Sequence, residues 1–267
     1  MTSVPRVLVI AGSDSGGGAG IQADIKTIAA FGGYAATAIT AVTAQNTLGV
    51  QGVWPVAPEF VVLQIRLVLE DIGADAIKTG MLVDGAMIEA VAGALGEAAA
   101  PLVVDPVMVA KGGRALLESA AVGRLRALLI PRAALLTPNV PEAEILAGVV
   151  IEDLEGMRRA AEILCRAGAR AVLIKGGHLP GEVVHDVLLA GEQEDMFRAP
   201  RIVSRAGHGT GCTLASAIAV GLARGGELAG VVREAREFVR AGLEHGLDLG
   251  AGHQPLDHGV AGPWGRR

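Results

Sequence analysis

The run Gly207-His208-Gly209-Thr210-Gly211-Cys212-Thr213 leads directly into an apolar segment over residues 214–223. Small and apolar residues recur in that segment at helical spacing, which predicts a glycine-rich turn that opens a buried helix. The first turn of a helix has backbone N–H groups without partners and the positive end of the dipole, and glycines let a phosphate approach closely. The run therefore indicates an anion-binding turn, although similar turns also serve as plain connections.

Cys212 falls within the first turn of this predicted helix. A positive field lowers the pKa of a thiol there, so we expect a reactive sulfur beside the bound anion. The alternative is a small core residue, which is the commoner role of a cysteine in an alanine-rich helix. Cys165 shares one face of a predicted helix with Met157, Ala161 and Leu164, and we expect it to be structural.

Further residues with chemical potential follow the ends of predicted strands. Apolar segments at 6–11, 34–44, 76–79, 101–104, 135–137 and 171–174 have the composition of buried strands. The residues that follow them are the loop 12–20 with Gly12, then Gln45, Met81, Asp105 with Val107, Asn139 with Glu142, and Lys175. Because open α/β sheets bind small molecules at the carboxyl ends of their strands, these residues are expected to gather around one ligand.

Two of these side chains suit a heteroaromatic ring. Gln45 could offer an amide donor and acceptor together to a ring edge, and Met81 could supply an apolar contact, although methionine is more often a core residue. Asp24 falls in the first or second turn of a helix that begins near Gly20. It is expected to be either a surface carboxylate or a polar group that faces the ligand.

Other side chains suit phosphate and metal. Asp105 could hold Mg²⁺ through water, and Lys175 precedes two glycines at a strand end, a favourable place for binding phosphate. Asn139 and Glu142 have the spacing of a capping box, so their structural role is well supported. Glu142 could at the same time face a metal-bound water.

The remaining pattern alternates with these strands. Helices are expected over 58–70, 84–95, 154–167 and 228–243, and a β-hairpin over 183–190 and 194–197. This alternation predicts a doubly wound α/β domain of mostly parallel strands. We expect one domain over residues 1–250, followed by a loosely ordered tail over 251–267.

Composition narrows the class of protein. The chain has 267 residues, a net charge of −5 and no basic cluster, which argues against nucleic-acid or anionic-membrane partners. Its apolar runs are too short or too interrupted by glycine for a membrane span, and residues 1–5 do not resemble a signal peptide. We therefore expect a cytoplasmic protein. Two cysteines allow neither a disulfide framework nor a four-thiolate metal site.

Taken together, seven segments resemble the hydroxymethylpyrimidine and hydroxymethylpyrimidine-phosphate kinases of thiamine biosynthesis, in the ribokinase superfamily. The segments are 11–24, 43–47, 78–82, 105–108, 137–142, 175–178 and 208–213. They cover nearly the whole chain in the order and at the spacing of that family. The resemblance implies a ribokinase-like three-layer α/β/α fold that uses ATP and Mg²⁺ to phosphorylate 4-amino-5-hydroxymethyl-2-methylpyrimidine and then its monophosphate.

The resemblance also implies roles for residues. Those expected to line the pyrimidine pocket are Gly12, Asp24, Gln45, Met81 and Val107. Those expected to form the anion hole are Gly209, Thr210, Gly211 and Cys212. Lys175 and Asn139 would serve the nucleotide, and Asp105 and Glu142 the metal. Most sugar kinases of the superfamily have Asp at the position of Cys212, so we hypothesise that its thiolate accepts the proton of the substrate hydroxyl.

Two departures and two alternatives accompany this resemblance. Family members carry Glu or Gln at the position of Gln45, and Ala206-Gly207 replaces the more usual polar-Thr pair before His208. A pyridoxal or pyridoxine kinase would act on a similar hydroxymethylated ring. A non-catalytic ligand-binding protein would keep the pocket without needing Cys212, Lys175 and Asp105 together. Relatives in the superfamily suggest a homodimer.

Overall fold

The computed structural model describes residues 4–96, 98–109 and 113–260. Within those residues, nine strands form one sheet in the order β3-β2-β1-β4-β5-β6-β7-β8-β9. The strands are β1 Arg6–Asp14, β2 Tyr34–Asn46, β3 Gly49–Pro55, β4 Ala76–Thr79, β5 Leu102–Val104, β6 Leu135–Leu136, β7 Ala171–Lys175, β8 Val183–Ala190 and β9 Gln193–Pro200. Six neighbouring strands of the sheet run parallel, namely β2, β1, β4, β5, β6 and β7. Strands β3, β8 and β9 extend the sheet through antiparallel pairs.

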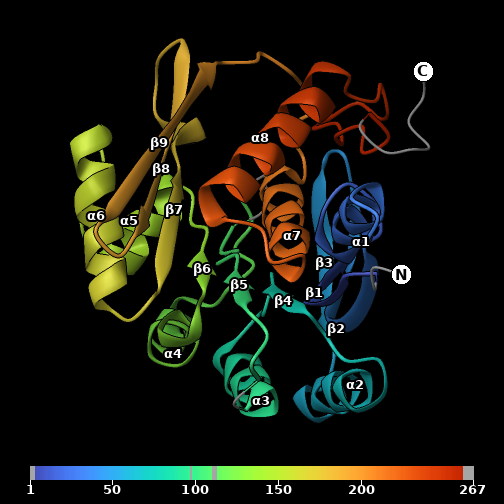
Figure 1. Ribbon diagram of the computed structural model, residues 1–267. Helices are drawn as coiled ribbons and strands as arrows, with labels where there is room; N and C mark the ends of the chain where they lie inside the picture. The colour runs from blue at the N-terminus through green and yellow to red at the C-terminus, as the bar shows by residue number, and fades with distance from the viewer. Residues whose placement is uncertain (1–3, 97, 110–112, 261–267) are drawn as a thin grey trace.

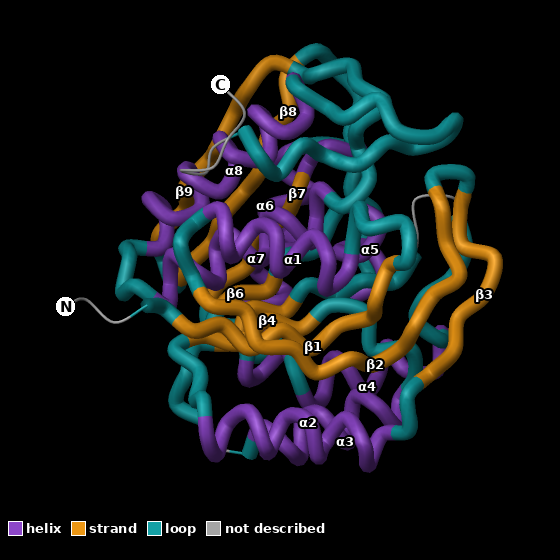
Figure 2. Tube along the Cα trace, turned by 90° about the vertical axis from the view of Figure 1, so that its right-hand side faces the viewer, coloured by secondary structure: helices purple, strands orange, loops and turns teal. Residues whose placement is uncertain are grey.

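Helices cover both faces of this sheet, as Figures 1 and 2 show. The α-helices are α1 Gly20–Ala30, α2 Pro58–Asp71, α3 Gly85–Leu95, α4 Val122–Leu128, α5 Val140–Ala147, α6 Leu154–Arg166, α7 Thr210–Ala223 and α8 Leu228–Glu244. Three 3₁₀ turns are η1 Ser119–Ala121, η2 Ile130–Arg132 and η3 Gly176–His178. Helices α1, α7 and α8 lie on one face, and α2 to α6 on the other. The predicted three-layer α/β/α fold is therefore confirmed.

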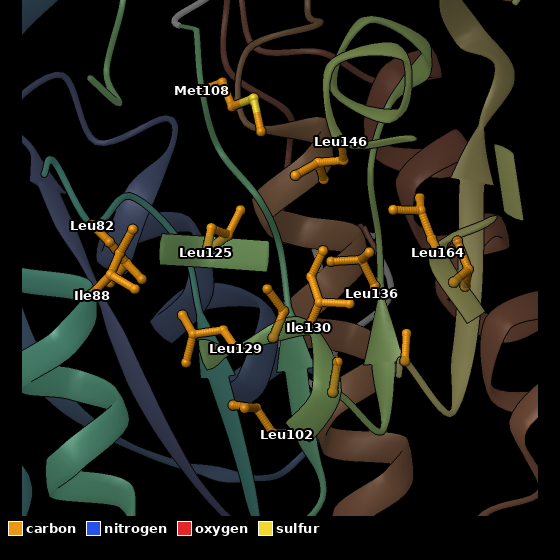
Figure 3. Packing of buried hydrophobic residues seen from close by; sticks show 14 of the residues in the cluster. Leu82, Ile88, Leu102, Met108, Leu125, Leu129, Ile130, Leu136, Leu146 and Leu164 are labelled. Carbon is orange, nitrogen blue, oxygen red and sulfur yellow. The ribbon is translucent and has the colours of Figure 1, made fainter. Parts of the chain in front are cut away.

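Each face of the sheet has its own hydrophobic core. Alternate residues of β1 point to opposite faces, so Leu8 and Ile10 join one core while Val7 and Val9 join the other. Figure 3 shows part of the first core, where Leu136 of β6 lies among side chains from the surrounding helices and turns. A sheet buried on both faces explains why its strands have continuous apolar sequences.

Local capping signals place two helices as expected. Asn139 and Glu142 form the predicted capping box, with the Glu142 N–H donating to Asn139 Oδ1 at 2.9 Å and the Asn139 N–H donating to Glu142 Oε2 at 2.8 Å. Asp84 was expected inside a helix, but it is the N-cap of α3 and accepts from the Met87 N–H. These caps fix the first turns of α3 and α5 beside the carboxyl ends of β4 and β6.

Two elements differ from the prediction. Strand β2 continues to Asn46 and turns back into β3, which the sequence analysis did not predict. Strand β3 pairs only with β2, and none of its side chains is fully buried, so it lacks the apolar signal of the central strands. Helix α4 was also not predicted, because it has only 7 residues and follows the short turn η1.

The predicted loosely ordered tail is wrong for residues 251–260. Gln254, Leu256 and His258 are buried against the domain, and the backbone of this segment hydrogen-bonds to residues far away in the sequence. Residues 261–267 of the predicted tail lie outside the described residues. Among the described helices, none combines the length and the apolar character needed to cross a membrane.

Candidate active site

A cavity of about 390 Å³ opens at the carboxyl ends of the parallel strands. Twelve of the thirteen predicted site residues line it, and together they come from the ends of β1, β2, β4, β5, β6 and β7 and from the start of α7. These twelve are Gly12, Gln45, Met81, Asp105, Val107, Asn139, Glu142, Lys175, Gly209, Thr210, Gly211 and Cys212. The thirteenth, Asp24, is not in the wall of the cavity.

The glycine-rich turn before α7 has the geometry of an anion site. Gly209 adopts a left-handed φ of 85°, and a Cβ built on it would lie 1.8 Å from the Gly18 carbonyl oxygen. Only glycine fits this position, because both the conformation and the close backbone contact exclude a side chain. Helix α7 then begins at Thr210, so its first N–H groups and its positive dipole end face the cavity.

A cation and a carboxylate lie beside this turn. Lys175 Nζ is 3.0 Å from Asp105 Oδ1 and 3.3 Å from the position of a Cβ built on Gly211. The Lys175 side chain is only 16% exposed. Burial alone would lower the pKa of Lys175, but the carboxylates of Asp105 and Glu142 raise it above the usual value. Lys175 is therefore a fixed positive charge next to the anion turn.

Asp105 and Glu142 form the carboxylate side of the cavity. Asp105 Oδ1 contacts Lys175 and accepts from Thr137 Oγ1, whereas its buried Oδ2 has no hydrogen-bond partner among the described residues. Burial, together with the charge of Asp105, raises the pKa of Glu142 to about 7, against the lowering effect of Lys175. A second positive charge near these two carboxylates would satisfy the free Oδ2 and favour the ionised form of Glu142.

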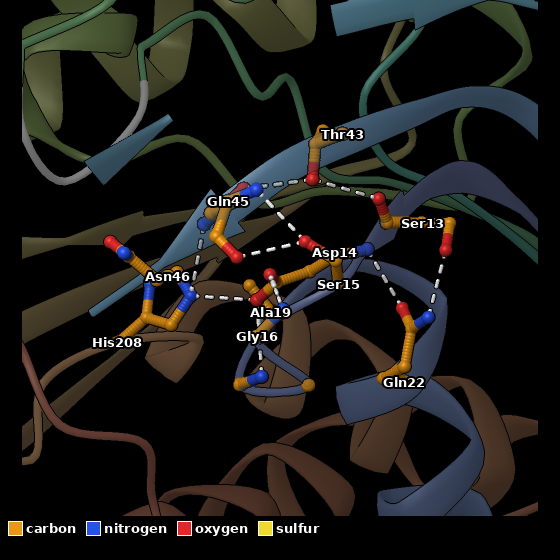
Figure 4. A network of polar contacts seen from close by, with 12 residues as sticks. Ser13, Asp14, Ser15, Gly16, Ala19, Gln22, Thr43, Gln45, Asn46 and His208 are labelled. Atoms are coloured by element: carbon orange, nitrogen blue, oxygen red, sulfur yellow. Dashed lines mark hydrogen bonds and ion pairs between the residues drawn. The ribbon is translucent and has the colours of Figure 1, made fainter. Parts of the chain in front are cut away.

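A second polar cluster lines the cavity where the 12–20 loop meets the 205–209 loop (Figure 4). The Asp14 carboxylate accepts from the Gly16, Gly18 and Ala19 N–H groups at 2.8–3.0 Å and pairs with His208 Nε2 at 2.8 Å. Burial alone would raise the pKa of Asp14, but the hydrogen bonds from His208 and the backbone lower it. Asp14 is therefore an anion at neutral pH.

Gln45 is attached to this cluster. Its Nε2 lies 3.2 Å from His208 Nε2, and its Oε1 accepts from Thr43 Oγ1. Asp14 lies in the 11–24 segment and His208 in the 208–213 segment, but their sequence positions alone predicted no role for either side chain. The signal that could have identified Asp14 is a carboxylate followed by Gly16-Gly17-Gly18, whose backbone N–H groups can turn toward it.

Apolar contacts complete the wall on the Gln45 side. A Cβ built on Gly12 would lie 2.7 Å from Met81 Cε, so the glycine makes room for the methionine. The Met81 side chain is almost buried, and its carbonyl accepts from Thr40 Oγ1. Val107 also lines the cavity. This side could hold a flat ring between apolar groups, with the Gln45 amide near the ring edge.

Asp24 differs from the prediction that it faces the ligand. Its side chain is fully buried, where it pairs with Lys78 Nζ at 2.9 and 3.0 Å and accepts from Ser216 Oγ at 2.7 Å. Lys78, by contrast, reaches the cavity wall and was given no role in the sequence analysis. A lysine in the middle of the buried strand 76–79 was the available signal, because a buried charge needs a partner.

The expected low pKa of Cys212 is also wrong. Burial raises the pKa of its thiol to about 11, and the negative charges of Asp24 and Asp105 add to this effect. Lys78 and a hydrogen bond from the Gly20 N–H act in the opposite direction but do not compensate. The helix terminus therefore places the sulfur beside the anion turn without making it a thiolate.

The chain is similar to known kinases over nearly its whole length. Residues 14–257 match the family model described as phosphomethylpyrimidine kinase. A hydroxymethylpyrimidine/phosphomethylpyrimidine kinase of Streptomyces coelicolor is 51% identical over 257 residues, which cover 96% of this chain and 95% of that relative.

Solved structures of a pyridoxal kinase and of a phosphomethylpyrimidine kinase have the same fold as this chain. An ADP complex of Bacillus subtilis pyridoxal kinase matches with a TM-score of 0.89 and 36% identity, covering 97% of this chain and 98% of that one. A phosphomethylpyrimidine kinase from Clostridium difficile matches with a TM-score of 0.79 and 39% identity, covering 89% of this chain and 98% of that one.

Proposed function

The chain belongs to the phosphomethylpyrimidine kinase family, and we propose that it phosphorylates 4-amino-5-hydroxymethyl-2-methylpyrimidine and then its monophosphate, with ATP as the phosphate donor, in the synthesis of thiamine diphosphate. The observation that carries this proposal is the division of one cavity into a ring side and a phosphate side. Gln45 and Met81 lie on the ring side, and the anion turn with Lys175 lies on the phosphate side. A hydroxymethyl group on a ring between them would point toward the anion turn.

On the phosphate side, the chain supplies positive charge at fixed positions. Phosphoryl transfer depends mostly on positioning and on neutralising charge that spreads over the transferred group. The N–H groups at Gly209, Thr210, Gly211 and Cys212 would hold that group, and Lys175 would bind the nucleotide phosphates. Asn139, whose side chain already caps α5, would lie beside the nucleotide.

The carboxylate side fits Mg²⁺. Asp105 has a buried oxygen, Oδ2, without a hydrogen-bond partner among the described residues. Glu142 has a pKa of about 7, so a nearby cation would favour its ionised form. Mg²⁺ is usually bound through one or two carboxylates together with substrate phosphates, and Asp105 and Glu142 would supply the carboxylates. Mg²⁺ bound here would neutralise the charge of the nucleotide phosphates. Asp105 and Glu142 would orient it.

We further propose that Cys212 accepts the proton of the substrate hydroxyl. It lies in the first turn of α7, partly exposed to the cavity, with the Gly20 N–H bonded to its sulfur. Because the pKa of its thiol is about 11, only a small fraction is thiolate at pH 7. A proton acceptor of this kind would make turnover increase with pH.

Pyridoxal is the second candidate acceptor, since the matching solved structures include a pyridoxal kinase. The family model and the higher identity to the pyrimidine kinase favour the pyrimidine. The predictions of a cytoplasmic location and a homodimer stay predictions.

The test is to incubate purified protein, ATP and Mg²⁺ with the pyrimidine alcohol and to follow the products by mass spectrometry. The proposal predicts a monophosphate that appears first and is then consumed as the diphosphate accumulates. Absence of both products, with a protein that is folded by circular dichroism, would refute it and would favour the non-catalytic ligand-binding alternative.

A further inference from the structure

Residues 251–260, here called the strap, join two edges of the cavity. On one side, the His253 N–H donates to the Thr47 carbonyl at 2.8 Å, at the β2–β3 turn just beyond Gln45. On the other side, the Gln254 N–H donates to the Arg205 carbonyl at 2.8 Å, and Gln254 accepts from the His208 N–H at 3.1 Å. The strap thus bonds both to the ring side and to the loop that leads into the anion turn.

The strap is anchored by burial as well as by hydrogen bonds. Leu256 is 1% exposed, and its side chain packs against Gly242 of α8, where a Cβ would lie 3.1 Å from Leu256 Cδ2. Pro255 forms a backbone bridge with His208 and contacts Gly18, whose carbonyl in turn touches Gly209. A displacement of the strap would therefore be transmitted to Gly209 through packed backbone.

One side chain of the strap contacts the first turn of α7 directly. His258 Nε2 lies 2.9 Å from Thr213 Oγ1, and both residues are buried. Thr213 follows Cys212, and its N–H donates to the Gly209 carbonyl at 2.9 Å to close the first turn of the helix. Burial, with a smaller contribution from Lys26, lowers the pKa of His258 to about 4, so the imidazole is neutral near pH 7.

A neutral imidazole at a buried site suits a structural hydrogen bond. It offers one donor and one acceptor, and a threonine hydroxyl can serve either of them. The bond adds a constraint at the residue next to Cys212, in addition to the backbone bond from Thr213 to Gly209. The site tolerates little movement there, because a misplacement of about 1 Å can reduce the rate of a positioned reaction by roughly 10²-fold.

We propose that the strap is a positioning element of the phosphoryl-transfer site, and that His258 acts through Thr213 to hold the anion turn in register with the ring side of the cavity. The inference rests on the proposed kinase function. The strap is therefore expected to affect the turnover number as well as the stability of the protein.

The experiment measures kcat and KM for wild type, His258→Phe, Thr213→Val and the double variant, at a temperature at which all four are folded. Each single variant is expected to lower kcat by roughly tenfold, while KM for the pyrimidine and for ATP changes by less than about threefold. Because both changes break one bond, the double variant should be no slower than the slower single variant.

Two further variants separate positioning from stability. His258→Gln replaces the imidazole with an amide, which also offers a donor and an acceptor to the Thr213 hydroxyl, and should recover most of the lost kcat. His245→Phe makes the same chemical change at the exposed residue that follows the last turn of α8 and serves as the matched control, with unchanged kcat.

The proposal would be overturned if His258→Phe lowered the melting temperature but left kcat unchanged, or if the effects of the two single variants simply multiplied. Failure of the wild-type protein to phosphorylate any acceptor would instead count against the proposed function. Turnover by the wild type, measured first, keeps the two outcomes distinct.

Discussion

Lys78 and Asp24 form an ion pair in which neither side chain is exposed to solvent, with Nζ 2.9 Å from Oδ1 and 3.0 Å from Oδ2. The pair joins β4 to α1, and Ser216 adds α7 by donating to the same carboxylate. Although burial lowers the pKa of Lys78, the charges of Asp24 and Asp105 raise it above the usual value, so the lysine stays charged. The Lys78 side chain in the cavity wall is thus held by a buried ion pair.

Breaking this pair should cost far more than breaking an exposed one. Lys78→Met leaves the Asp24 carboxylate buried without its positively charged partner and is expected to lower the free energy of unfolding by about 3–5 kcal/mol. The control is Arg66→Met, which breaks a pair between Arg66 and Glu70 whose side chains are more than 60% exposed, and which should cost less than about 1 kcal/mol. Urea denaturation measures both; equal losses would contradict a strongly coupled buried pair.

The pKa of Cys212 leads to a prediction for the pH profile. With a pKa of about 11, the thiolate fraction increases about tenfold per pH unit below that value. Labelling of Cys212 by iodoacetamide, resolved from Cys165 by peptide mass spectrometry, should therefore still be increasing at pH 9. If Cys212 accepts the proton, kcat/KM should increase over the same range, and Cys212→Ala should lower kcat by roughly 10²–10⁴-fold.

Two results would contradict this account of Cys212. Labelling that is complete by pH 8 would show a thiol pKa near or below the usual value. Near-normal turnover of Cys212→Ala would remove the proton-acceptor role while leaving the anion turn intact.

The pKa of Glu142 predicts that the Mg²⁺ dependence of activity changes with pH. Its carboxyl group has a pKa of about 7, mainly because it is buried, so it is mostly neutral at pH 6 and mostly ionised at pH 8. A neutral carboxyl attracts a cation less strongly, so the Mg²⁺ concentration for half-maximal activity should be higher at pH 6 than at pH 8. Glu142→Gln should remove most of this pH dependence; a variant that retains it would assign the titration to another group.

Gly209 and Gly225 form a matched pair for testing the anion turn. Both have a left-handed φ, of 85° and 75°, so alanine introduces a similar backbone strain of order 1 kcal/mol at each. Only at Gly209 would the new Cβ collide with backbone, since nothing lies within 4 Å of a Cβ at Gly225. Gly209→Ala is expected to lower kcat by at least about tenfold, and Gly225→Ala to leave it unchanged. Similar kcat values for both variants would contradict the close fit of the turn against Gly18.

The sequence was most informative where a local pattern decides the structure. The strand segments before Gly12, Asp105 and Lys175 have apolar runs, and their common edge follows from parallel topology. The capping box of α5 is likewise a local signal. These features were sufficient to predict the fold and to bring twelve residues to one cavity.

The sequence was least informative where long-range packing decides. Whether Asp24 faces the ligand or Lys78 depends on how α1 lies over β4, and the pKa of Cys212 depends on its burial more than on its place in a helix. The strap has no hydrophobic periodicity, because its order comes from hydrogen bonds to Thr47, Arg205 and His208. None of these relationships is expressed in the spacing of residues along the chain.

The ring specificity is the central claim, and a competition assay tests it most directly. The pyrimidine alcohol and pyridoxal are supplied in equal amounts with limiting ATP, and both phosphorylated products are quantified by mass, which gives the ratio of the two kcat/KM values. The account predicts that the pyrimidine products dominate by at least about tenfold, a difference of about 1.4 kcal/mol in transition-state binding. Dominance of pyridoxal phosphate would contradict it and would reassign the cavity wall at Gln45 and Met81 to a pyridine ring.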